Sequence, residues 1–206
     1  AIGALFTSAA CVLFPQAQRG MYIKRLMPTF FGLVFVSFLL QYFIRILQVG
    51  GSESDDLFIG FGLFFSLWVV VVAKFSDIGA LLVGKAIGRT KLAPSISPGK
   101  TIEGLIGGFG ASAGMGALLP WIFQEKFPDV VYFGDWVFTP VQGALWGFVI
   151  ALSAVIGDLI ASVMKRLASM KDSGGAIPGI GGLFDLTDSL ILAAPTGYLI
   201  LFLLQK

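Results

Sequence analysis

The chain is built from long apolar runs that follow one another with only short polar breaks. A membrane-spanning helix needs about 20 apolar residues, and five runs are long enough. They are Pro28–Leu47, Leu57–Gly88, Thr101–Phe123, Val141–Met164 and Leu183–Leu204, and a shorter run, Ala1–Phe14, precedes them. A mean hydropathy of +0.90 with 13% charged residues cannot supply the polar surface of a soluble domain. The pattern predicts an all-α, polytopic transmembrane helical bundle, organised as a single domain over residues 1–206.

Three of these runs carry further information. Leu57–Gly88 exceeds one span, so we expect a kink near Phe75 or an extension beyond the bilayer. Residues 101–116 hold six glycines, which favour close helix–helix packing in lipid, within one chain or between two. The run at Ala1 has no basic flank and does not start with Met, so we expect upstream helices in a longer protein.

Charge distribution predicts the topology. The first, third and fifth loops are basic and the alternate loops, 49–56 and 124–139, are acidic. The basic residues are Arg19, Lys24, Arg25, Arg89, Lys91, Lys100, Lys165, Arg166 and Lys171. The positive-inside rule places these loops in the cytoplasm, and we expect a bacterial inner membrane. A net charge of +2 gives no reason to expect a nucleic-acid partner, and the absence of histidine excludes histidine-based catalysis.

A polar stripe lies at the end of the run Val141–Met164. Asp158, Ser162 and the pair Lys165 and Arg166 recur at helical spacing, so they share one face. A carboxylate in the bilayer is expensive and usually marks a functional interior. Snorkelling at a helix end explains the two cations alone, but it does not explain Asp158.

A second face of the same kind lies in the segment 74–89. Asp77, Leu81 and Lys85 share it, and Gly84 and Gly88 keep it open. An interhelical ion pair with a purely structural role is the alternative interpretation. Both patterns place ionisable groups near the predicted cytoplasmic face.

The segment Lys91–Gly104 indicates an anion site. Pro94 and Pro98 prevent a continuous helix, and Thr101 can cap the helix that follows. A helix N-terminus beside Ser97 and Lys100 is suited to a phosphate. The spacing differs from that of a P-loop. Glu103 can serve as a capping residue or as a metal ligand, and capping is the ordinary role.

The segment Lys171–Asp188 combines glycines with carboxylates. Asp172 precedes a loop that holds Gly179, Gly181 and Gly182, and Asp185 and Asp188 follow at i and i+3. Carboxylates that converge on a phosphate-sized space describe a Mg²⁺ site, because Mg²⁺ prefers oxygen ligands and shares them with substrate phosphates. A favourable interaction with the helix dipole is the alternative.

These segments, within residues 74–188, resemble the phosphatidate cytidylyltransferase (CDP-diacylglycerol synthase) family. Its signature runs roughly S-x-x-K-R-x4-K-D-x-G-x2-[LIF]-P-G-H-G-G-x-x-D-R-x-D. The matching residues are Ser162, Lys165, Arg166, Lys171, Asp172, Gly174, Ile177, Pro178, Gly179, Gly181, Gly182, Asp185 and Asp188. Two positions depart from it, Ile180 in place of the histidine and Leu186 in place of the arginine.

The resemblance implies an enzyme, a Mg²⁺-dependent nucleotidyltransferase of phospholipid biosynthesis. Its substrates would be CTP and phosphatidate in the membrane, and its products CDP-diacylglycerol and pyrophosphate. Family analogy also allows a second cation and a homodimer. The implied metal ligands are Asp185, Asp188 and Asp158, with Asp77 and Asp172 as further candidates. The implied phosphate-binding residues are Lys100, Lys165, Arg166 and Lys171, and Gly179, Gly181 and Gly182 would let loop amides approach phosphate oxygens; Ser97, Ser162 and Lys85 join the predicted substrate site.

There are four alternatives at this point, and the sequence argues against one of them. The chain could transfer a nucleotide to another lipid phosphate, or it could be a transporter whose intramembrane charges form an ion path. A CDP-alcohol phosphotransferase would need D-G-x2-A-R-x8-G-x3-D-x3-D, which is missing. A non-catalytic scaffold with a decayed site is the fourth, and it is suggested by Ile180 and Leu186.

Overall fold

A computed structural model describes residues 37, 39–49, 60–94, 97–133, 136–167 and 183–204. Apart from residues 37 and 39, these residues belong to one compact unit, Leu40–Lys206. The predicted run Ala1–Phe14 and the glycine-rich loop after Lys171 lie outside the described residues. The prediction of a single domain over residues 1–206 therefore stays a prediction.

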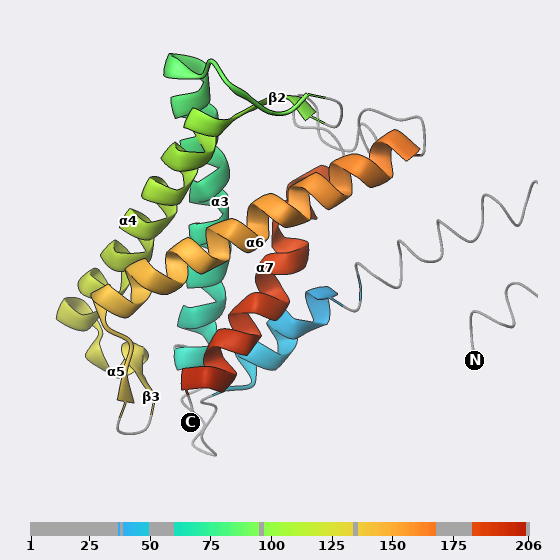
Figure 1. Ribbon diagram of the computed structural model, residues 1–206. Helices are drawn as coiled ribbons and strands as arrows, with labels where there is room; N and C mark the ends of the chain where they lie inside the picture. The colour runs from blue at the N-terminus through green and yellow to red at the C-terminus, as the bar shows by residue number, and fades with distance from the viewer. Residues whose placement is uncertain are drawn as a thin grey trace, which may run out of the picture. The chain divides into compact units, whose positions relative to one another are not determined.

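Four long helices form the bundle (Figure 1). They are α3 (Phe61–Ile87), α4 (Ile102–Lys126), α6 (Pro140–Leu167) and α7 (Leu183–Leu204). Each contains a stretch long and apolar enough to cross a membrane. Residues 40–47 are also helical, and Ile46 from this stretch is fully buried. The predicted all-α polytopic bundle is confirmed.

Helix α3 runs without interruption through Phe75. Its 27 residues correspond to about 40 Å at 1.5 Å per residue, which exceeds the roughly 30 Å of a bilayer's hydrocarbon core. The unbroken helix fits the second predicted alternative, an extension beyond the bilayer.

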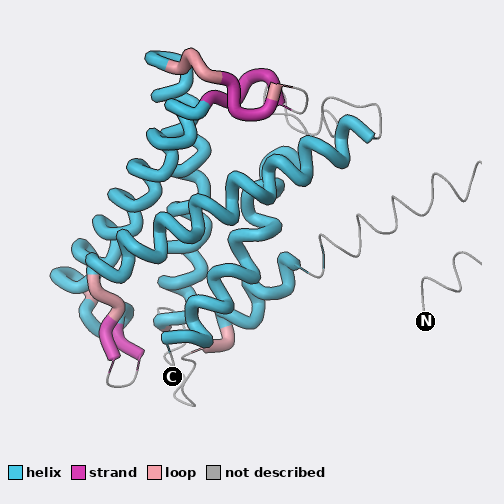
Figure 2. The backbone as a smooth tube through the Cα atoms, in the orientation of Figure 1, coloured by secondary structure: helices cyan, strands magenta, loops and turns pink. Residues whose placement is uncertain are grey.

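A hairpin joins α3 to α4. Strands β1 (Lys91–Ala93) and β2 (Ser97–Thr101) pair antiparallel. Prolines between and within the strands exclude a helix in this segment. Thr101 then caps α4 as predicted, since its Oγ1 accepts a hydrogen bond from the Gly104 amide at 3.1 Å. The hairpin lies over one end of the bundle (Figure 2).

Glycines set the distances between the helices. A Cβ atom at Gly108 would lie 2.7 Å from the carbonyl oxygen of Ser76 in α3. Gly116 of α4 and Gly143 of α6 meet backbone to backbone, with no room for a Cβ atom at either. These contacts confirm the expected close packing within one chain. Around Gly110 and Gly114, by contrast, nothing lies within 4 Å of an added Cβ.

The opposite end of the bundle is closed by a second hairpin (Figure 2). The short helix α5 (Pro128–Val131) leads into strands β3 (Tyr132–Phe133) and β4 (Trp136–Val137), which pair antiparallel. Phe138 follows β4, is fully buried, and packs against Phe65 and Trp68 of α3 at ring distances of 5.4 and 5.1 Å. An aromatic cluster therefore fills this end of the bundle.

Candidate active site

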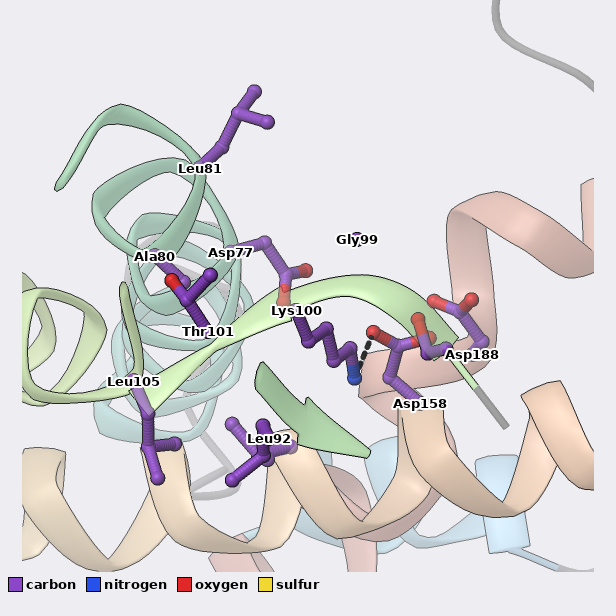
Figure 3. A pocket seen from close by; sticks show the side chains of 12 residues that line it. Asp77, Ala80, Leu81, Leu92, Gly99, Lys100, Thr101, Leu105, Asp158 and Asp188 are labelled. Carbon is purple, nitrogen blue, oxygen red and sulfur yellow. Dashed lines mark ion pairs between the residues drawn. The ribbon is translucent and has the colours of Figure 1, made fainter. Parts of the chain in front are cut away.

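A cavity of about 430 Å³ lies under the β1–β2 hairpin (Figure 3). Four charged side chains line it, and each comes from a different element: Asp77 from α3, Lys100 from β2, Asp158 from α6 and Asp188 from α7. Segments far apart in the sequence thus converge on one space. Among the predicted site residues with described side chains, these four and Ser97 line the cavity.

Lys100 crosses the cavity to reach α6. Its Nζ lies 2.6 Å from Oδ2 of Asp158, and both side chains are about one quarter exposed (24%). The short β2 strand brings Lys100 there, because Thr101 anchors the strand's end at the start of α4. The hairpin therefore carries a cation into the site (Figure 3).

Asp188 lies beside Asp158 on the neighbouring helix (Figure 3). It is almost fully buried, and its Oδ2 is 3.8 Å from Nζ of Lys165. Gly157 permits this approach, because a Cβ atom there would lie 2.9 Å from the Asp188 carbonyl oxygen. The two carboxylates and the Lys165 ammonium are thus held together by close packing of α6 on α7.

Asp77 is held by a contact that the sequence did not reveal. Lys74 lies one helical turn earlier, with Nζ 3.6 Å from Oδ2 of Asp77. The same Nζ donates a hydrogen bond of 2.9 Å to Oγ of Ser189 in α7. Neither Lys74 nor Ser189 was among the predicted site residues. The available signal was a lysine in the middle of an apolar run, three residues before Asp77.

Other predicted residues lie elsewhere. Lys85 and Arg166 are exposed near the ends of α3 and α6, and they and Ser162 are not among the residues that line the cavity. Glu103 accepts hydrogen bonds from the amides of Arg89 and Thr90, so it fastens the turn before β1. Several predicted residues fall outside the described part: Lys171, Asp172, Gly179, Gly181, Gly182 and the side chain of Asp185.

The cavity is amphiphilic. Apolar residues that include Leu92, Leu105 and Val155 make up much of the remaining lining, and the labelled leucines lie away from Asp188 in Figure 3. Leu81 also lines the cavity and is 55% exposed. A ligand with an anionic head and an apolar body matches this division.

The donor set is compatible with a divalent cation shared with a substrate. Within the described residues, no group of three or more side chains is placed to hold a metal ion. Asp158 and Asp188 nevertheless present two carboxylates to one cavity. Mg²⁺ is commonly held by one or two carboxylates plus substrate phosphates, so these two residues fit such an ion.

Fold and site together define a membrane-spanning helical protein with a charged cavity near one end of its helices. The model of the cytidylyltransferase family matches residues 2–204. The chain therefore belongs to the cytidylyltransferase family.

Curated relatives agree with this membership. A phosphatidate cytidylyltransferase of Synechocystis is 41% identical over 143 residues, which is 69% of this chain and 45% of the relative. The enzyme of the same name from Chlamydia trachomatis is 34% identical, over 85% of this chain and 54% of the relative. The one from Bacillus subtilis is 32% identical, over 82% and 56%. The chain thus spans about half the length of these relatives.

Proposed function

We propose that the protein transfers a cytidylyl group from CTP to phosphatidate, giving CDP-diacylglycerol and pyrophosphate in phospholipid biosynthesis. The observation that carries the proposal is the cavity in which Lys100, Asp158 and Asp188 converge, in a chain of the cytidylyltransferase family. Relatives at 32 to 41% identity bear the name of this activity.

The reaction suits the residues of the cavity. A phosphate oxygen of phosphatidate attacks the α-phosphorus of CTP, a new P–O bond forms, and the bond to pyrophosphate breaks. Such transfers depend on positioning and on neutralising charge. The attacking phosphate is already an anion and needs no general base, so a chain without histidine can perform the reaction.

Each charged group has a role in this proposal. Lys100 neutralises phosphate oxygens, and Lys165 balances Asp188. Asp158 and Asp188 hold Mg²⁺, which when bound supplies further charge neutralisation at the transferred phosphoryl group. Asp185, Asp77, Arg166, Lys171 and Asp172 keep their predicted roles as further ligands of metal and phosphate.

The cavity's position supports a lipid substrate. It lies near one end of the membrane-spanning helices, and part of its wall is apolar. A lipid phosphate at headgroup depth could enter with its chains along that wall. The loops at this end carry Arg89 and Lys91, whereas the opposite end carries Glu125 and Asp129 with Lys126 between them. By the positive-inside rule this asymmetry supports a cavity that faces the cytoplasm. The bacterial relatives support a bacterial inner membrane.

The test is transfer by the full-length protein, purified in detergent. Radiolabelled CTP is supplied with phosphatidate, in Mg²⁺ or in EDTA, for the wild type and Asp158→Asn. We expect a labelled CDP-lipid with Mg²⁺, none with EDTA, and at least a hundredfold less from the variant. Because Asp158 lines the cavity directly, its loss should exceed the 10- to 100-fold typical of outer-shell residues.

Other lipid phosphates and nucleotides belong in the same assay. Product from a different lipid phosphate would redirect the proposal toward that acceptor. A folded wild type that is silent with every pair would overturn it, and would point to Ile180 and Leu186 as marks of a lost activity.

A further inference from the structure

Lys74 occupies an unusual place for a charged side chain. It is the middle residue of α3, thirteen residues from either end of the helix Phe61–Ile87. Its neighbours Val72 and Ala73 are fully buried. An ionisable residue inside a membrane-spanning helix is costly and usually functional. The contacts of Lys74 therefore indicate what it does.

Two of those contacts connect α3 to α7. Lys74 Nζ donates to Oγ of Ser189 at 2.9 Å and lies 3.6 Å from Oδ2 of Asp77. Ser189 is fully buried, so its hydroxyl group has to find its hydrogen-bond partners inside the bundle. Lys74, Ser189 and Asp77 thus form a small polar link between two helices.

This link lies directly behind the cavity. Neither Lys74 nor Ser189 lines the cavity, but Lys74 is one turn from Asp77, and Ser189 follows Asp188 in sequence. Asp188 Oδ1 also accepts a 2.7 Å hydrogen bond from the Ser189 amide. Fixing Ser189 against α3 therefore fixes the rotation of α7, and with it the direction in which Asp188 faces.

We propose that Lys74 and Ser189 are positioning residues that hold Asp77 and Asp188 toward the cavity. This inference rests on the proposed function for its activity readout. A purely structural role would be the alternative, in which Ser189 and Asp77 only compensate a partly buried cation. The two roles differ in what a substitution changes.

The experiment compares Lys74→Met and Ser189→Ala with matched controls in the full-length protein. Lys126→Met removes an exposed lysine at the far end of α4, and Ser153→Ala removes a hydroxyl that bonds within its own helix. Three quantities are measured: kcat at saturating CTP, the Mg²⁺ concentration for half-maximal rate, and the shift in melting temperature as Mg²⁺ is titrated with CTP present.

We expect each variant to lower kcat about 10- to 100-fold and to raise the half-maximal Mg²⁺ concentration about tenfold, as loss of an outer-shell partner does. The melting shift should need correspondingly more Mg²⁺. Lys74→Arg, which keeps the charge and the donors, should restore most of the rate. The double variant should lose no more than the worse single variant, because both substitutions break one link. The controls should match the wild type.

Two results would overturn the inference. One is a lower melting temperature with unchanged Mg²⁺ dependence, which would mean a structural role only. The other is additive losses in the double variant, which would mean that the residues act separately. If Lys74→Met does not fold, Ser189→Ala carries the test. If the wild type transfers nothing to any lipid phosphate, the proposed function fails, while the Mg²⁺-dependent melting shift still decides the positioning role.

Discussion

The two ends of the helix bundle are each closed by a two-stranded hairpin, yet they are packed in opposite ways. At the β3–β4 end, Phe138 is fully buried against the rings of Phe65 and Trp68. At the β1–β2 end, Lys100 and Asp158 keep about a quarter of their side chains exposed around a cavity of about 430 Å³.

The difference shows how one set of helices separates stability from chemistry. Helix α3 contributes to both ends, with Trp68 in the aromatic cluster and Asp77 in the cavity, less than three turns apart. The β3–β4 hairpin is followed by Phe138, whose ring fills the space beneath the hairpin. The β1–β2 hairpin, by contrast, places Gly99 and Lys100 at the cavity and leaves room for a ligand. We therefore expect substitutions at the aromatic end to change stability, and substitutions at the cavity end to change activity.

The largest effect should come from Phe138→Ala. This fully buried ring contacts four other aromatic rings, so its loss should cost about 3–5 kcal/mol of unfolding free energy. Unfolding in mixed detergent micelles measures this cost. Transfer per folded molecule should stay within about twofold of the wild type. A selective loss of activity would break the separation between the two ends.

Asp188→Asn should have the converse effect. We expect transfer to fall at least a hundredfold, as for Asp158→Asn, because a neutral amide replaces a carboxylate that lines the cavity. Asp129→Asn is the matched control, since Asp129 is exposed at the opposite end. Initial rates at saturating CTP provide the measurement. Equal rates for the two variants would show that Asp188 has no role in the active site.

Gly116→Ala tests the contact between helices α4 and α6, which lies between the two ends of the bundle. The added Cβ atom would meet the Gly143 carbonyl group of α6, so we expect a loss of about 1–3 kcal/mol through overpacking. Gly114→Ala on the same helix meets nothing within 4 Å and should instead stabilise α4 by about 0.5–1 kcal/mol. Unfolding midpoints for the two variants should therefore move in opposite directions.

Trp68→Phe should have the smallest effect. The indole Nε1 donates a 3.0 Å hydrogen bond to the Gly116 carbonyl oxygen, and phenylalanine keeps most of the ring packing. The loss of one hydrogen bond predicts a cost of about 1 kcal/mol, with unchanged transfer. A cost as large as that of Phe138→Ala would mean that the hydrogen bond, more than ring packing, holds this end together.

The helices could be predicted closely from the sequence, because the length of an apolar run determines a spanning helix. Leu183–Leu204 was predicted with the bounds that α7 shows, and Val141–Met164 differs from α6 by only a few residues. The hairpins could not be predicted. Prolines exclude a helix between α3 and α4, but they do not specify strand pairing. The β3–β4 hairpin depends on how Trp136 and Phe138 pack against α3, which is tertiary information.

The sequence predicted which charged residues belong to the site, but it did not predict which residues contact them. Lys100, Asp158, Asp188 and Asp77 stand out because charges are rare in apolar runs, and the structure brings them to one cavity. Their partners depend on which helices meet. Lys74 and Ser189 are 115 residues apart, and no local spacing relates them. The roles assigned to the glycine-rich loop stay predictions.

Among the described residues, the charged side chains in and beside the cavity are equal in number for the two signs. Three ammonium groups face three carboxylates, from Lys74, Lys100, Lys165, Asp77, Asp158 and Asp188. A divalent cation entering alone would leave these six groups positive, and a triphosphate alone would leave them strongly negative. Both states are costly where water is scarce. The bound cation offsets about half of the triphosphate's negative charge, so cation and nucleotide should each raise the affinity of the protein for the other by the same factor.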